Sequence, residues 1–314
     1  MATRLYVHSH PGSRPRNGVN EHPSELAERL RTAFEDCLEM DGPLAERLSA
    51  YAAASRAIFP AYGLAVDKLV ERVEENGGGR SAPAPGQSMP PFMLPDETGR
   101  FVELEALLSD AVTRVRAERK AVHIFDPAAG CGRYVIDAVR RLTGGPVTVT
   151  LRDWNPANAQ AAAHYARQAG LGSVSAGPGD AFDRRSLAGI APRPDIAVVS
   201  GLYELFPDNA PVADSLAGLA EALAGGGYLI YTNQPWHPQL EMIARVLDNR
   251  EGKPWVMRCR TQAEMDALVR AAGFEKLEML TDPDGIFTVS LARRSAPAGM
   301  RTLQEVPAYG AKQC

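Results

Sequence analysis

Apolar positions in the first quarter of the chain recur at spacings of three and four residues. This spacing predicts amphipathic helices over residues 24–75, with an interruption at Pro60. Residues 1–23 are polar and proline-rich, so we expect a flexible N-terminus there. The helical spacing is clearest at Leu26, Leu30, Phe34, Cys37 and Leu38.

The pattern changes after residues 76–95, whose Gly, Pro and Ser content predicts a linker or mobile loop. A helix is expected at 101–121, and short apolar runs then alternate with helical segments. The expected strands are 121–127, 147–153, 173–177, 194–201, 228–234, 276–280 and 287–294. The expected helices between them are 134–144, 158–170, 210–227, 239–249 and 261–274.

Strands that alternate with helices of this length predict an α/β fold, a doubly wound and mainly parallel sheet of seven strands. The last run, 287–294, is compatible with an antiparallel edge strand. The predicted organisation is a flexible N-terminus, a helical lid, a linker, a Rossmann-like domain and a tail. These cover 1–23, 24–75, 76–95, 96–296 and 297–314 respectively.

Composition narrows the class of protein. The formal net charge of −4 argues against a nucleic-acid partner, because binding to a polyanion usually needs a basic face. No apolar run is long enough for a membrane span, and the N-terminus lacks the apolar core of a signal peptide. The four cysteines are far apart and the histidines scattered, so no metal site is expected. We expect a cytoplasmic protein.

The stretch FDPAAGCGRY, residues 125–134, joins the first expected strand of the sheet to a helix. Small residues there let a ligand approach the backbone, and the helix N-terminus offers free N–H groups. A dinucleotide-binding motif requires a third small residue at the position where this chain has Val135. Asp126 would repel a pyrophosphate but suits a cationic amino group, which argues against a nicotinamide-dependent oxidoreductase.

The next two strand ends also carry carboxylates. Asp153 lies about 20 residues beyond the glycines, where a carboxylate can accept ribose hydroxyls; Asn155 is the better helix cap. Trp154 is expected either against an adenine face or in the core. Asp180 and the backbone N–H groups after it match an adenine edge, although a short loop would use the same residues.

Together these features resemble class I S-adenosylmethionine-dependent methyltransferases over about residues 121–295, within an uncharacterised bacterial branch whose members are sometimes fused to hydrolases. Ala128 replaces the first glycine of the family pattern. The resemblance implies S-adenosyl-L-methionine as cofactor. The cofactor-binding residues it implies are Asp126, Ala128, Gly130, Gly132, Tyr134, Asp153, Trp154, Asp180, Ala181, Phe182, Ser200, Gly201 and Leu202.

Acceptor-facing groups are expected after the fourth and fifth strands and on the N-terminal helices. Tyr203 and His237 are the catalytic candidates, the histidine because its ordinary pKa lies near neutrality. The alternative to a catalytic role is a helix start for Tyr203 and a rigid loop for His237. The alternative to a lid role for the aromatic residues of the N-terminal helices is core packing. The substrate and lid candidates are Tyr51, Tyr62, Glu204, Asn233, Gln234 and Trp236.

The expected function is methyl transfer to a small molecule, in a chain that is compatible with a homodimer. The Asn-Pro-Pro-Tyr motif of adenine-type methyltransferases is absent, which lowers nucleic-acid base methylation further. One alternative keeps the cofactor but attacks another sulfonium carbon, by cyclisation or aminocarboxypropyl transfer, and releases methylthioadenosine. A non-enzymatic binder is the third hypothesis.

Overall fold

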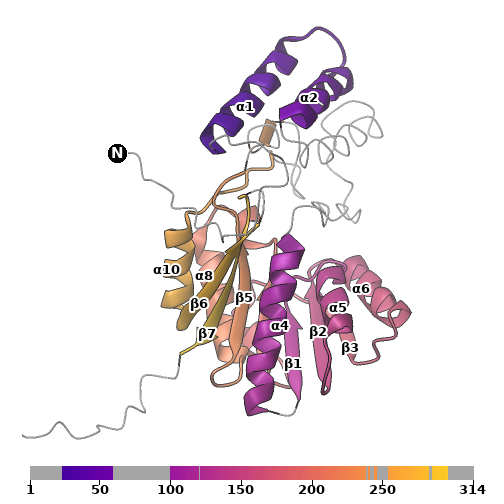
Figure 1. Cartoon of the computed structure of the whole chain (residues 1–314), viewed down its shortest axis with the longest axis vertical. Helices are drawn as coiled ribbons and strands as arrows, with labels where there is room; N and C mark the ends of the chain where they lie inside the picture. Colours follow the sequence, from indigo (N-terminus) through magenta and orange to yellow (C-terminus); the bar gives the residue numbers. More distant parts are fainter. Residues whose placement is uncertain are drawn as a thin grey trace, which may run out of the picture.

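The computed structural model describes residues 23–58, 100–119, 121–237, 240, 244–245, 254–282 and 285–295. A seven-stranded sheet with the order β3-β2-β1-β4-β5-β7-β6 forms its centre (Figure 1). The first five strands are parallel, and β7 is antiparallel to both of its neighbours. The strands are β1 (Val122–Asp126), β2 (Val147–Asp153), β3 (Val174–Pro178), β4 (Ile196–Val199), β5 (Tyr228–Asn233), β6 (Phe274–Thr281) and β7 (Thr288–Arg294).

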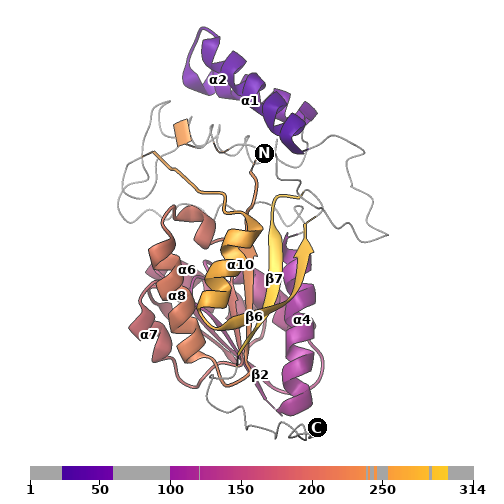
Figure 2. The ribbon, with the colours of Figure 1, turned by 90° about the vertical axis from the view of Figure 1, so that its left-hand side faces the viewer.

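Helices cover both faces of the sheet and bury its apolar side chains (Figure 2). On one face lie α4 (Arg100–Glu118), α5 (Arg133–Arg141) and α6 (Pro156–Gln168). On the other lie α7 (Arg184–Ala188), α8 (Asn209–Ala222) and α10 (Gln262–Ala271). β1 and β4 are buried along their whole length, as a parallel strand covered on both faces requires.

The strand order reverses between β1 and β4. The chain runs outward from β1 to β2 and β3, then returns to β4 on the other side of β1. In such sheets, ligands bind outside the carboxyl ends of the strands at this reversal. The loops after β1, β2, β3 and β4 therefore surround the expected site.

The predicted α/β class, strand number and mainly parallel sheet are confirmed. The final strand is antiparallel, but its expected place at the edge is wrong. β7 lies between β5 and β6, and β6 forms the edge. β7 can reach β5 because it follows β6 in a hairpin and then pairs along its whole length with the buried strand. Most of the helix expected at 239–249 lies outside the described residues.

Two further helices, α1 (Pro23–Glu39) and α2 (Leu44–Ile58), pack against each other. Both views place this pair beyond the carboxyl ends of the parallel strands (Figures 1 and 2). Whether this pair is the helical lid expected from the sequence stays a prediction. Residues 59–99, which include the rest of that lid and the expected linker, lie outside the described part of the chain. No helix among the described residues is long and apolar enough to cross a bilayer.

Candidate cofactor and acceptor site

Asp126 ends β1 and organises the turn that follows. Its side chain is completely buried. One carboxylate oxygen accepts the Ala128 N–H at 3.0 Å, and the other accepts the Tyr134 hydroxyl at 2.5 Å. Burial raises the pKa of this carboxyl to about 7; the two hydrogen bonds oppose the shift and Asp153 adds to it. Asp126 thus shapes the turn with both of its oxygens.

The two glycines of the turn have different roles. Both have positive φ, +56° at Gly130 and +66° at Gly132, which favours glycine. A Cβ on Gly132 would lie 2.6 Å from the Leu151 side chain, so this glycine allows α5 to approach β2. A Cβ on Gly130 would meet no atom within 4 Å. The backbone at Gly130 is therefore open to a ligand.

Asp153 at the end of β2 links this turn to the next helix. Its Oδ2 accepts the Gly130 N–H at 2.9 Å, and its Oδ1 accepts the Asn155 N–H at 2.8 Å and the Asn158 amide at 3.0 Å. A carboxylate has about four acceptor positions, which leaves capacity for one more donor. Asn155 caps α6 through the Ala157 N–H, as predicted.

Trp154 is 63% exposed at the same strand end. Of the two environments expected for this residue, the core is therefore excluded. A tryptophan side chain with this much exposed surface beside a half-buried carboxylate offers a flat apolar surface to a ligand.

The loop after β3 joins the same edge, because the Gly179 N–H donates to the Asp153 carbonyl oxygen at 3.0 Å. Asp180 Oδ1 accepts the Phe182 N–H at 2.9 Å, so this N–H is already used inside the loop. The Phe182 ring packs edge-on against Phe206, with ring centroids 4.5 Å apart, and lies 6.5 Å from the Tyr203 ring. Aromatic packing thus ties the loops after β3 and β4 together.

The loop after β4 begins with Ser200, Gly201 and Leu202. The Gly201 N–H donates to the Thr232 hydroxyl on β5 at 2.8 Å. Ser200 is buried, and its hydroxyl has no hydrogen-bond partner in the described structure. Gln234, one residue beyond β5, is also buried, and its Oε1 likewise has none. Two neighbouring strands are therefore each followed by a polar atom without a hydrogen-bond partner in the described part of the chain.

The environment of Tyr203 does not support the catalytic role expected for it. The side chain is 2% exposed and belongs to the core beneath α8. Its hydroxyl bonds to Ser215 at 3.0 Å, and burial raises its pKa. A phenol held in this way supports packing. Tyr203 also begins a short 3-10 helix, Tyr203–Leu205, in line with the helix start that the sequence left open as the alternative.

The expectation that His237 titrates near neutrality is wrong. The side chain is 7% exposed, and burial lowers its pKa to about 3. The imidazole is therefore neutral across the physiological range and is a weak base. The sequence motif around His237 gave no sign of this burial, which depends on distant segments.

The remaining candidates divide between buried and partly exposed positions. Asn233 is buried and donates to the Arg260 carbonyl oxygen at 3.1 Å and to Gln262 at 3.3 Å. Glu204, the residue after Tyr203, is buried, whereas Trp236 is half-buried. Tyr51 is 1% exposed and packs edge-on against Phe34 at 5.2 Å within the α1–α2 pair. Tyr62 lies outside the described residues.

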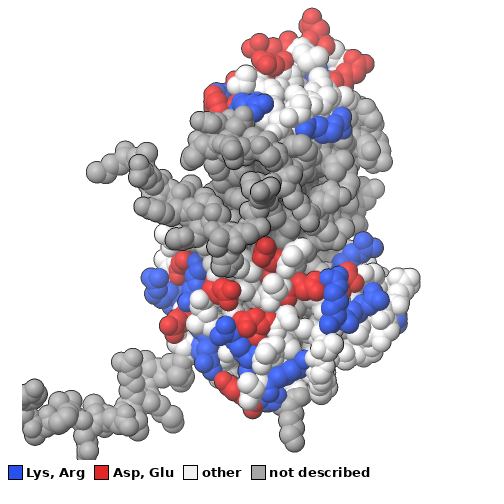
Figure 3. Space-filling view, in the orientation of Figure 1, with Lys and Arg blue, Asp and Glu red and all other residues white. Residues whose placement is uncertain are grey.

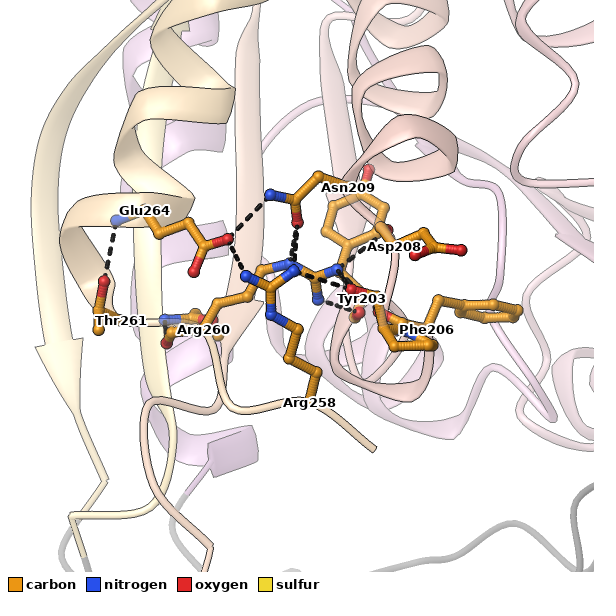
Figure 4. Close-up of polar contacts among 10 residues, drawn as sticks. Tyr203, Phe206, Asp208, Asn209, Arg258, Arg260, Thr261 and Glu264 are labelled. Carbon is orange, nitrogen blue, oxygen red and sulfur yellow. Dashed lines mark hydrogen bonds and ion pairs between the residues drawn. The ribbon is translucent and has the colours of Figure 1, made fainter. Parts of the chain in front are cut away.

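Sequence reasoning missed two arginines in residues 254–261, a mostly irregular segment that we call the strap. Arg260 is 1% exposed and Arg258 partly exposed, and both point at the loop after β4 (Figure 4). Glu264 accepts from Arg258 at 2.5 Å and from Asn209 at 2.8 Å, which closes the network. The signal available in the sequence was an arginine directly before a capped helix start, in RCRTQAE.

The residues around this sheet edge fit S-adenosyl-L-methionine. The open Cβ position at Gly130 admits a ligand to the backbone, Asp153 keeps an acceptor position, and Trp154 offers an exposed ring. A third carboxylate, Asp180, follows β3. Among the described residues no cluster of His, Cys, Asp and Glu could hold a metal ion.

The fold of this part of the chain is Rossmann-like, with carboxylate side chains at the ends of neighbouring parallel strands. Residues 98–294 match the family model described as "Putative methyltransferase", and the chain belongs to that family.

A curated bacterial protein is also similar to this chain. Escherichia coli K12 YnbC, described as an uncharacterized protein, is 51% identical over 199 residues, which are 62% of this chain and 34% of that protein. The chain thus spans about a third of the length of the curated relative it matches.

Two solved structures are also similar. A protein described as a possible exported protein from Bordetella parapertussis has 19% identity and a TM-score of 0.52, covering 87% of this chain and 96% of that one. This likeness supports the fold alone. An O-methyltransferase family protein from Burkholderia thailandensis has 17% identity and a TM-score of 0.49, covering 87% and 70%.

Proposed function

We propose that this protein transfers a methyl group from S-adenosyl-L-methionine directly to a small polar molecule. The observation that carries the proposal is the convergence of the loops after β1, β2 and β3 at the carboxyl ends of these strands. They bring the open backbone of Gly130, the acceptor capacity of Asp153 and the exposed ring of Trp154 together beside the strand reversal. Asp180 extends the same edge toward β3.

When bound, S-adenosyl-L-methionine supplies an activated methyl group on a positively charged sulfonium. The chain's own residues then have to hold the two reactants in line, which is the main source of rate enhancement for such a reaction. We assign Asp153 to hydrogen bonding with ribose hydroxyls and Trp154 to stacking on adenine. The backbone around Gly130 and Ser200 would face the methionine portion.

The unpartnered atoms of Ser200 and Gln234 support a class of acceptor. Buried polar atoms almost always have a hydrogen-bond partner, so these two favour a ligand that carries N–H or O–H groups. The carboxylates of Asp153 and Asp180 at the same end of the sheet disfavour an anionic ligand. The proposed acceptor is therefore a neutral or cationic small molecule.

The reaction we propose does not depend on a protein base. A base is needed only when the acceptor holds its proton at neutral pH. His237 is neutral with a pKa of about 3, and the hydroxyl of Tyr203 is bonded to Ser215. This environment favours a neutral acceptor whose nucleophilic atom carries no proton that must be removed first, such as an unprotonated amine.

On the one face that Figure 3 shows, the surface charge favours a small-molecule acceptor over a nucleic acid. On the face shown in Figure 3, acidic and basic side chains are interspersed across the described residues. A nucleic-acid interface would instead gather Lys and Arg on one face. Whether two copies pair, as the sequence allows, stays a prediction.

The test is to incubate the purified chain with S-adenosyl-L-methionine alone and follow the products by mass spectrometry. Binding without conversion, followed by formation of S-adenosylhomocysteine when amine acceptors are added, supports the proposal. Methylthioadenosine formed above the spontaneous rate would instead establish attack at another sulfonium carbon. An Asp153→Ala variant is the control, because it should lose cofactor binding in either case.

A further inference from the structure

The side chain of Arg260 donates almost all of its hydrogen bonds to one short loop, residues 203–209. Nη1 donates to the carbonyl oxygen of Tyr203 at 2.6 Å, and Nη2 donates to those of Phe206 at 2.7 Å and Asp208 at 3.0 Å. Nε donates to the Asn209 side chain at 2.8 Å (Figure 4). The almost fully buried guanidinium of Arg260 thus attaches residues 203–209 to the strap.

Arg258 reinforces the same attachment. Its backbone N–H donates to the Glu204 carbonyl oxygen at 3.1 Å, and its Nη1 donates to that of Pro207 at 2.9 Å. From the other side, Asn233 at the end of β5 donates to the Arg260 carbonyl oxygen at 3.1 Å. The strap is therefore bonded to both the loop after β4 and the end of β5.

The loop that Arg260 holds is in contact with the loop after β3. Phe206 and Tyr203, two of the residues whose carbonyls Arg260 binds, are the two aromatic residues that pack near Phe182. Phe182 follows Asp180, whose carboxylate accepts its N–H. A continuous set of contacts therefore runs from the strap to the adenine side of the site.

We propose that Arg260 is a positioning residue that fixes the adenine-side wall of the cofactor site through the backbone of residues 203–208. This inference rests on the proposed function, and it takes the loop after β3 as the adenine side of the site, as the family resemblance of Asp180 implies. Arginine suits the task because its planar guanidinium presents five donors in a fixed arrangement. A lysine has three donors at one point and cannot reach the separate carbonyls of Tyr203, Phe206 and Asp208 together.

The chain offers a matched control in Arg193. This arginine also donates to three backbone carbonyl oxygens, those of Glu221, Ala222 and Leu223. They lie at the C-terminal end of α8, and Arg193 precedes β4, so its contacts are at the opposite end of the sheet from the site. Arg193 is exposed, unlike Arg260, so Arg193→Lys controls for the loss of an arginine that binds backbone carbonyls, and it leaves the loops of the candidate site untouched.

The experiment is calorimetric titration of wild type, Arg260→Lys and Arg193→Lys with S-adenosylhomocysteine and with 5′-methylthioadenosine. We expect Arg260→Lys to weaken both ligands by about tenfold or more, the loss typical of a hydrogen bond to a charged group, and by the same factor, because both contain adenine. Arg193→Lys should bind both as tightly as wild type. Equal affinities for wild type and Arg260→Lys would overturn the inference.

Two further measurements separate this inference from the proposed function. Hydrogen exchange without ligand should rise in Arg260→Lys at residues 180–184 as well as 203–208, whereas Arg193→Lys should raise exchange only near 221–223. No rise at 180–184 overturns the inference whether or not the cofactor binds; absent wild-type binding overturns the proposed function alone. If Arg260→Lys fails to fold, Phe206→Leu replaces it, and unchanged affinity in that variant counts against the inference.

Discussion

Trp154 and Asp126 lie at the ends of adjacent strands in opposite environments. The tryptophan is 63% exposed, whereas the carboxyl of Asp126 is completely buried and bonded twice within its own turn. A change at the first should therefore act on a ligand, and a change at the second should act on the folded chain itself. Each residue leads to its own prediction.

Trp154→Ala should weaken binding of S-adenosylhomocysteine by about five- to a hundredfold, since stacking of a base on an aromatic side chain contributes about 1–3 kcal/mol. Stability should change by less than about 0.5 kcal/mol, because the residue is exposed. Trp154→Phe, which keeps a ring, is the control and should retain most of the affinity. Titration calorimetry and urea unfolding check the two parts; wild-type affinity in the alanine variant would exclude the stacking role.

Asp126 predicts a pH dependence of stability. Its folded pKa of about 7 lies above the ordinary value of 3.8, so between these values the folded chain keeps a proton that the unfolded chain has lost. The free energy of unfolding contributed by this group is therefore fully present below about pH 4 and falls as pH rises toward 7.

Asp126→Asn should remove this contribution to the pH slope. Urea unfolding at several pH values between 4 and 8 measures it. Glu221→Gln is the matched control, because Glu221 is exposed and its partner is Arg184 on the surface. A slope that is the same in Asp126→Asn and in wild type would mean that the buried carboxyl does not titrate in this window.

At the scale of elements, the junction between β1 and α5 contains two glycines with different expected effects. Gly132 should act mainly on folding, and Gly130 should act mainly on ligand binding. Gly132→Ala should destabilise the chain by about 2–4 kcal/mol, because strained backbone adds to overlap with Leu151 at 2.6 Å. Gly130→Ala introduces the backbone strain without the overlap, so it should lower the free energy of unfolding by about 1–2 kcal/mol.

The affinities of the same two variants complete this prediction. Gly130→Ala should lose cofactor affinity beyond what its stability explains, because its new methyl group enters the open side of the turn. Thermal unfolding with and without S-adenosylhomocysteine measures both quantities. Equal destabilisation by the two substitutions would contradict the close approach of α5 to β2.

Much of this junction is predictable from the chain alone. Gly130, Gly132 and the Asn155 cap are local signals, because positive φ and capping depend on a few consecutive residues. The strap is not predictable in this way. Arg260 finds its carbonyl partners 52–57 residues earlier in the chain, and no local pattern encodes such a pairing.

At the scale of the whole molecule, the α1–α2 pair lies beyond the carboxyl ends of the strands, where it faces the side of the sheet that carries the site (Figures 1 and 2). If this pair acts as a lid, adding S-adenosylhomocysteine should slow hydrogen exchange in residues 30–58 as well as in 126–132. Residues 139–147, at the opposite end of the sheet, serve as the internal control. Slowed exchange at 126–132 without any change at 30–58 would exclude a lid role.

The sequence by itself determined the order and type of most elements and the glycine turn after β1, because hydrophobic periodicity, glycines and caps act over short distances. Tertiary structure alone decided the insertion of β7 between β5 and β6, the commitment of Tyr203 to Ser215, the burial of His237 and the arginine attachment of the site loop. Burial and partner choice depend on segments that are distant in the chain, and they change what a side chain can do chemically.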